Sequence, residues 1–321
     1  MKRIYKILVV SGIALCICMA IAGCKSSKNK EQQEAYRQYG ISCMKSGNYE
    51  EALKAFQNAL DQSIGGVGDS EVDICLYKAK TQYLSGDTKG AKETYDALIN
   101  YKGYASAYYQ RGCFYFVQGK NKKGLADFEK AIEKDSKNYE LYIGVYETLT
   151  NSGYGKNPEN YLKTALKIKG SKAYDLMMKG RIYMLLGDYD KAITNLKEAV
   201  DKDEQQANFY LAQVYAAKGD DKQSDACFKE YTKSGDASAD DLASMAETLM
   251  EKEDYETAKQ YLEAASSMKD VTDLQTIKKN IIICYENLSD YDKARKLMES
   301  YIKDYPNDED AQKDYTFLKT R

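Results

Sequence analysis

The sequence predicts an all-α fold, a superhelical solenoid of about eight helix-turn-helix repeats that ends in a capping helix. A small residue recurs at the centre of alternate predicted helices in steps of 32 to 39 residues. A second set of apolar residues repeats at the same period in the intervening helices. The 321-residue chain contains only two prolines, and 43% of its residues are hydrophobic, which favours long uninterrupted helices.

The first 23 residues have the pattern of a secretory signal. Lys2, Arg3 and Lys6 precede an uncharged apolar run over residues 7–21, which is too short to favour spanning a membrane. The run ends in Ile-Ala-Gly followed by Cys24, which resembles the bacterial lipobox. That resemblance implies cleavage after residue 23 and acylation of Cys24, whose lipid would anchor the exported chain outside the cytoplasmic membrane. An uncleaved N-terminal anchor with an incidental cysteine is the alternative. Residues 24–32 are polar and are expected to form a flexible tether.

The repeat array is predicted over residues 33–307. The first helix of each repeat carries one central small or apolar marker, namely Gly40, Ala79, Gly112, Gly144, Gly180, Ala212, Ala246 and Ile282. The clearest repeat is Leu176 to Asp203, in which Gly180 faces Ala192 and Ala199 of the second helix. Small residues at these points let two helices approach closely.

The turns between paired helices carry glycine followed by a residue that can cap a helix. The pairs are Gly47-Asn48, Gly86-Asp87, Gly187-Asp188 and Gly219-Asp220. Glycine suits the end of a helix, and Asn or Asp can accept hydrogen bonds from the first amides of the next one. Asn48 and Glu51 also have the spacing of a capping box. Residues 308–321 predict a last helix that covers the exposed end of the array.

This pattern resembles the tetratricopeptide repeat, a 34-residue helical hairpin. The resemblance extends from Gln33 to Asn307. It departs from the family pattern where tryptophan is absent from the fourth position and where Gly124 and Ser224 replace the usual alanine. The family's carboxylate clamp needs Lys and Asn at positions 5 and 9, and it is absent because the first repeat has Arg37 and Ile41 there.

The resemblance also implies a groove lined mainly by positions 2, 5, 9, 12 and 13 of the first helices. In this sequence positions 5 and 12 give Leu76, Tyr83, Tyr109, Phe116, Leu141, Met177, Met184 and Phe209. An apolar and aromatic stripe across the second to sixth repeats would suit a protein or peptide partner. The alternative for each residue is packing against the neighbouring repeat.

Several other functions are disfavoured by composition. Histidine is absent, which removes imidazole catalysis and His-containing zinc sites. No phosphate loop, nucleophile elbow or calcium loop is present, so no cofactor, no metal and no enzymatic activity are expected. The formal net charge of -2 and the mixed charges do not favour a nucleic-acid partner. Beyond the signal and Cys24, five cysteines remain, and they are expected to be core thiols rather than a disulfide framework.

The predicted function is that of a membrane-anchored scaffold that binds a protein or peptide in its concave groove. The lipid would fix its position, and the groove would recruit a partner in the cell envelope. A structural envelope protein that acts by self-association is the alternative.

Overall fold

The computed structural model describes residues 29–63, 66–155, 157–268, 271, 273–306 and 308–320, and all regular secondary structure within them is helical. The predicted signal and Cys24 lie outside these residues. The end of the expected tether, residues 29–32, belongs to a helix that continues to residue 45. Among the described residues, none of the helices combines the length and apolar character needed to cross a bilayer.

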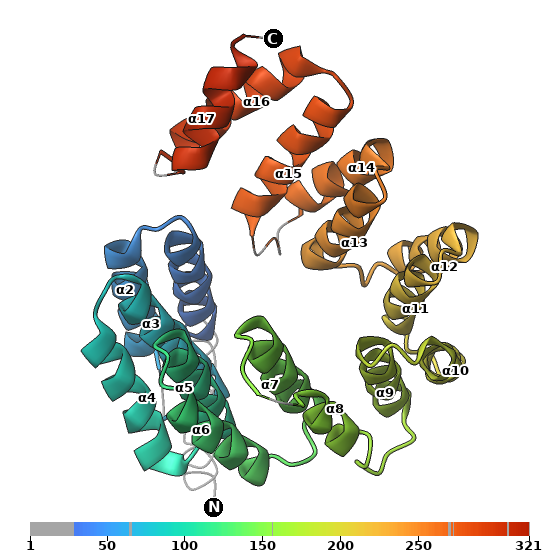
Figure 1. Cartoon of the computed structure of the whole chain (residues 1–321). Coiled ribbons are helices and arrows are strands. Elements are labelled where there is room, and N and C mark those ends of the chain that lie inside the picture. Colours follow the sequence, from blue (N-terminus) through green and yellow to red (C-terminus); the bar gives the residue numbers. More distant parts are fainter. Residues whose placement is uncertain are drawn as a thin grey trace, which may run out of the picture. The chain divides into compact units, whose positions relative to one another are not determined.

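The chain divides into two compact units, Met1–Ser136 and Lys137–Arg321. Unit 1 begins with the helix over residues 29–45, and each following helix packs against the one before it. These helices are α2 (Tyr49–Asp61), α3 (Asp69–Leu84), α4 (Thr88–Lys102), α5 (Ala105–Val117) and α6 (Asn121–Lys134). Figure 1 shows them as antiparallel neighbours joined by short turns.

Unit 2 continues the pattern of paired helices. Its elements are α7 (Tyr139–Asn151), α8 (Glu159–Ala165), α9 (Ala173–Leu185), α10 (Tyr189–Val200), α11 (Ala207–Ala217), α12 (Asp221–Ser234), α13 (Ala239–Glu251), α14 (Tyr255–Ser266), α15 (Leu274–Asn287), α16 (Tyr291–Asp304) and α17 (Glu309–Leu318). The first helix of each pair packs on the second, and α17 packs on α16 (Figure 1). Ala311 and Leu318 of α17 are buried in the same cluster as Met298 of α16.

The central glycines of three repeats lie at close contacts between paired helices, as predicted. A Cβ atom added to Gly112 would lie 2.5 Å from the ring of Phe128, and one added to Gly180 would lie 2.5 Å from Cγ of Leu196. At Gly40 the equivalent distance to the ring of Phe56 is 2.7 Å. All three distances are shorter than carbon atoms tolerate, so glycine is required at these contacts.

Most of the predicted turns are confirmed. Gly187 and Gly219 have φ of 74° and 77°, which favours glycine. The aspartate that follows each of them accepts a hydrogen bond from the amide three residues later. The capping box predicted at Asn48 is wrong. Asn48 makes no side-chain cap, and the Glu51 carboxylate instead accepts a hydrogen bond from Lys54 Nζ at 3.0 Å.

The five cysteines of the described chain are all free thiols. Cys43 and Cys284 are buried and the other three, Cys75, Cys113 and Cys227, are half-buried. Burial raises the pKa of the Cys284 thiol to about 11, so that thiol is protonated at neutral pH. The cysteines therefore behave as packing residues, as the sequence predicts.

Candidate partner-binding surface

The first helices α3 and α5 present equivalent faces because their residues follow the same helical spacing. Residues separated by four, seven and eight positions lie on one side of a helix. On α3 that face comprises Leu76, Lys80, Tyr83 and Leu84, and on α5 it comprises Tyr109, Cys113, Phe116 and Val117. The Tyr83 ring meets the Phe114 ring of α5 edge to face, with 5.5 Å between centroids, so the two helices lie side by side.

The structure divides the eight predicted groove residues into two classes. Leu76, Tyr83, Tyr109 and Met184 are half-buried, whereas Phe116, Leu141, Met177 and Phe209 are buried. Phe116 stacks on Phe128 of α6 with 5.3 Å between ring centroids, and Phe209 packs against Tyr231 of α12 at 5.7 Å. The expectation of an accessible stripe is therefore corrected for the four buried residues, which fill the space between paired helices.

Two exposed aliphatic residues were missed by the sequence reasoning. Leu84 and Val117 directly follow Tyr83 and Phe116, and their exposed fractions are 43% and 68%. Both end their helices, 33 residues apart, so they occupy the same place in consecutive repeats. The signal was available in the sequence, since the inner face of this repeat includes position 13 as well as position 12. We call the set Leu76, Lys80, Tyr83, Leu84, Tyr109, Cys113 and Val117 the α3/α5 face.

An ion-pair network holds α5 in place behind this face. The guanidinium of Arg111 donates to Asp127 of α6 at 2.7 and 2.8 Å and also contacts Asp96 of α4. These hydrogen bonds, chiefly those to Asp127, raise the pKa of Arg111 despite its burial. Arg111 therefore links three consecutive helices and fixes the position of α5 relative to α4 and α6.

In unit 2 the equivalent helix faces are bridged by polar contacts. Arg181 of α9 donates to both carboxylate oxygens of Glu140 on α7, at 2.9 and 3.0 Å. Its guanidinium also lies over the Tyr210 ring of α11, 5.6 Å from the centroid. Gln213 of α11 reaches Ser244 of α13 at 3.3 Å. These side chains connect successive first helices, so the apolar stripe expected along this part of the array is interrupted.

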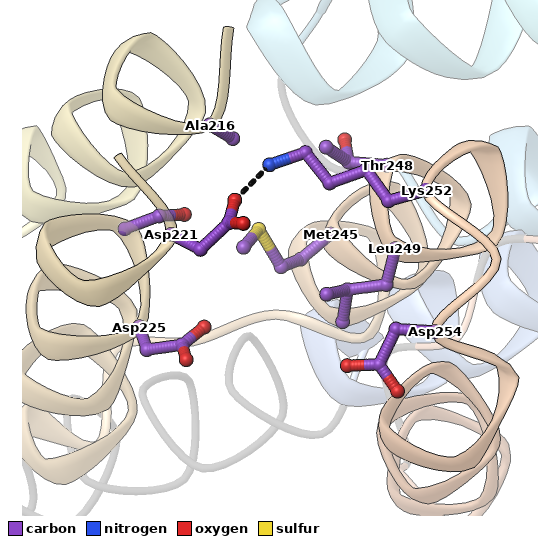
Figure 2. Close-up of a pocket in the computed structure, with 9 residues that line it drawn as sticks. Ala216, Asp221, Asp225, Met245, Thr248, Leu249, Lys252 and Asp254 are labelled. Carbon is purple, nitrogen blue, oxygen red and sulfur yellow. Dashed lines mark hydrogen bonds and ion pairs between the residues drawn. The ribbon is translucent and has the colours of Figure 1, made fainter. Parts of the chain in front are cut away.

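Unit 2 also contains a small polar pocket between two helix pairs, with a volume of about 150 Å³. Figure 2 shows Asp221 of α12 facing Lys252, the residue directly after α13, and the two form an ion pair. Asp254 also lines the pocket, but its carboxylate caps α14 by accepting from Thr257 N at 3.2 Å. No group of three or more metal-ligating side chains occurs in the described part of the chain. The pocket is a small gap between repeats that is lined by this ion pair and a helix cap.

Tetratricopeptide repeat models match the chain in both units. Models described as tetratricopeptide repeats match residues 33–63, 105–138, 242–271 and 280–308, and a further TPR repeat model matches residues 180–219. The matched segments lie within the predicted array, except that one of them extends a single residue beyond it, to residue 308. The periodicity identified in the sequence is therefore that of this repeat.

Two kinds of similar protein were found. A segment of 106 residues is 30% identical to the DnaJ protein P58IPK homolog B of Oryza sativa subsp. japonica and covers 32% of this chain. The chain spans about a fifth of the length of the curated relatives that it matches. Among solved structures, yeast Tom70 aligns over 92% of this chain and 76% of its own, with 13% identity and a TM-score of 0.57. A tetratricopeptide repeat protein from Parabacteroides merdae aligns over 79% of this chain and 99% of its own, with 12% identity and a TM-score of 0.47.

The likeness to Tom70 shows the fold, and the repeat models show the sequence pattern that builds it. The helix pairs, the glycine contacts between them and the absence of strands in the described residues agree with both. The chain therefore contains tetratricopeptide repeats and has the all-α solenoid fold of tetratricopeptide repeat proteins.

Proposed function

We propose that this chain is a membrane-anchored scaffold that binds an apolar segment of a partner protein on its α3/α5 face. A tetratricopeptide fold supports a role as a protein interaction scaffold in general. The observation that carries the specific proposal is the exposure of Leu84 and Val117 at the same position of adjacent repeats. Half-buried Tyr83 and Tyr109 belong to the same helix faces and supply aromatic area for an apolar partner.

The shape of the face suits an amphipathic helix or an extended apolar segment. Its apolar residues come from two parallel positions of rigid helices, so little ordering is needed when a partner binds. Lys80 is exposed between the apolar positions of α3 and favours a partner that carries an acidic residue beside its apolar ones. The partner class we propose is therefore an apolar segment with acidic residues at its edge.

The anchor in this proposal is an acyl group on Cys24. Its support is the sequence alone, namely the basic start, the apolar run and the lipobox-like ending. Cys24 lies five residues before residue 29, where the described helix begins. A short connection of this kind would hold the array close to the outer surface of the cytoplasmic membrane or to the membrane to which the lipid is sorted.

Site-specific photocrosslinking in the native cell tests the binding face. A photoreactive amino acid at position 84 or 117 is expected to give a covalent adduct with a partner protein. The same amino acid at Leu288, an exposed leucine at the end of α15, is the matched control and should give no such adduct. Leu84→Glu should abolish the adduct formed from position 117. Equal labelling at 288, or an adduct that persists in Leu84→Glu, would remove the face from the proposal. An adduct of twice the chain mass would favour self-association.

Fractionation tests the anchor independently. The wild-type chain is expected in the membrane fraction, and mass spectrometry of its first peptide should show an acylated Cys24 at the N-terminus. Cys24→Ala should prevent acylation and cleavage after residue 23. An unmodified Cys24 in the membrane-bound wild-type protein would refute the lipid anchor and leave the binding face to be judged by the crosslinking result.

A further inference from the structure

An apolar cleft in unit 1 lies apart from the α3/α5 face. It runs between α3 and α4, has a volume of about 540 Å³, and is lined mainly by apolar surface. Its lining includes the small residues Cys75 of α3 and Gly90 and Ala97 of α4, which leave space between the two helices. Val67 and Tyr101 line the cleft at one end of the helix pair, and their exposed fractions are 41% and 64%.

The residues at this end form a patch of mixed character. Tyr104 lies there as well, since its hydroxyl donates to the carbonyl oxygen of Val67 at 3.4 Å. The ammonium group of Lys102 lies 5.6 Å from the centroid of the Tyr104 ring. We call Val67, Tyr101, Lys102 and Tyr104 the anchor-proximal patch. One aliphatic side chain, two tyrosines and a lysine are the residue types that proteins place at the boundary between lipid tails and headgroups.

Hydrogen bonds hold the start of the described chain beside this patch. Gln33 donates to the Glu71 carboxylate at 2.8 Å, and the amide of Gly68 donates to the other oxygen of Glu71 at 2.9 Å. Gly68 directly follows Val67 of the patch. Glu71 therefore holds the first turns of the helix over residues 29–45 at the end of α3 that carries the patch.

The position of the anchor follows from chain length. Cys24 precedes residue 29 by five residues, which reach at most about 18 Å when fully extended. An acyl group on Cys24 would keep a lipid surface within that distance of the point where the chain enters the helix. The local concentration of lipid at the patch would then be far higher than that of any soluble partner.

We propose that the anchor-proximal patch rests on the lipid surface that holds the acylated Cys24. The proposal rests on the anchor in the proposed function and adds a second contact to it. Val67 and Tyr101 enter the interfacial region, and the ammonium group of Lys102 meets lipid phosphates. Within the chain, Gln33, Gly68 and Ser63 donate hydrogen bonds to the Glu71 carboxylate beside the patch. The contact would orient unit 1 with the start of α3 and the end of α4 toward the membrane.

Fluorescence can test this contact because the chain contains no tryptophan. Tyr101→Trp places a reporter in the patch, and Leu84→Trp places one at the opposite end of α3, about 23 Å along the helix axis. Both variants are made in the mature chain, with an oligohistidine tag in place of residues 1–23. The chain contains no histidine of its own, so the tag alone attaches it to vesicles of phosphatidylcholine with a nickel-chelating lipid.

On these vesicles, the emission of Tyr101→Trp is expected to shift to shorter wavelength. A lipid that carries a spin label near the headgroup should quench it several-fold more than it quenches Leu84→Trp. Val67→Asp in the Tyr101→Trp background should abolish both effects. Equal quenching of the two reporters would overturn the proposal. So would a Tyr101→Trp reporter that is already shielded without vesicles, since a second copy or another part of the chain would then cover the patch.

The two proposals fail separately. The tag supplies the attachment in this experiment, so its result does not depend on whether Cys24 is acylated. Fractionation of wild type and Cys24→Ala reports the acyl anchor alone. An acylated chain whose Tyr101→Trp reporter stays in water would keep the anchor and refute the second contact.

Discussion

Two guanidinium nitrogens of Arg111 donate hydrogen bonds to the Asp127 carboxylate, at 2.7 and 2.8 Å, and these bonds link α5 to α6. Asp127 is almost fully buried, with 6% of its surface exposed. Arg111→Ala leaves that carboxylate without its cation, and the free energy of unfolding should fall by about 3 kcal/mol. Urea unfolding followed by circular dichroism measures the change. Arg295→Ala is the control, since Asp292 is largely exposed and the expected change is below about 0.5 kcal/mol.

Gly112→Ala tests the close contact between α5 and α6. Alanine would normally stabilise a helix interior by about 1 kcal/mol relative to glycine. Here the added methyl group would lie 2.5 Å from the ring of Phe128, which is fully buried and packs against the rings of Phe116 and Tyr109. We expect a net loss of about 1–2 kcal/mol in the free energy of unfolding. A variant as stable as wild type would show that the helix pair can separate at low cost.

The variant Phe116→Ala tests whether the Phe116 side chain serves packing between helices or contact with a partner. Because Phe116 stacks on Phe128 and is 7% exposed, its truncation should lower the free energy of unfolding by about 3–5 kcal/mol. Val117→Ala, one residue further on and 68% exposed, should change it by less than about 0.5 kcal/mol. Thermal unfolding of the two variants provides the comparison. A Phe116→Ala variant of unchanged stability that loses its partner would restore Phe116 to the groove.

The last helix should be sensitive to acid through Asp308. Its carboxylate accepts hydrogen bonds from Tyr301 Oη at 2.8 Å, from Lys279 Nζ at 3.2 Å and from Ala311 N at 3.0 Å. Burial alone would raise the pKa of Asp308, but these hydrogen bonds outweigh it and lower the pKa. A depressed pKa gives stability that is present above the unfolded value of about 4 and is lost as pH falls through the folded value.

Asp308→Asn keeps a side chain that can cap α17 but removes its charge. At pH 7 the variant should lose about 1–2 kcal/mol of local protection in α17, because hydrogen bonds to a charged acceptor are replaced by neutral ones. Near pH 2 the difference from wild type should vanish. Hydrogen exchange of the α17 amides measures both values. Asp310→Asn is the control, since Asp310 is exposed on the same helix. A difference that is equal at both pH values would assign the effect to shape rather than charge.

The repeat register could be predicted from the sequence because close packing restricts residue size. Only glycine fits where the Phe128 ring approaches α5, so Gly112 reveals that contact without any structure. Turn chemistry is almost as restrictive, as Gly187 and the capping Asp188 show. Asn48 is the exception. A capping box also depends on the hydrogen-bond partner of the residue three positions later, and here the Glu51 carboxylate accepts a hydrogen bond from Lys54.

The groove was less predictable because exposure depends on the neighbouring repeat. Tyr83 and Phe116 occupy equivalent positions, yet only Phe116 is buried, beneath the stacked ring of Phe128. In unit 2, Arg181 pairs with Glu140, which lies 41 residues earlier in the chain. Helical periodicity places a side chain on a face, but it does not tell which long-range partner will cover that face.

The attachment of Gln33 to Glu71 also determines where the protein would bear mechanical load. If the chain is tethered at Cys24 and its partner is pulled, the force enters the array through the first turns of the helix over residues 29–45. The bonds from Gln33 to Glu71 and from Arg37 to Asp73, at 2.8 and 2.6 Å, are the first to carry it. The packed ring of Phe56 under Gly40 lies beyond them. Under tension, the first helix pair would therefore separate from α3 before the remaining repeats are deformed.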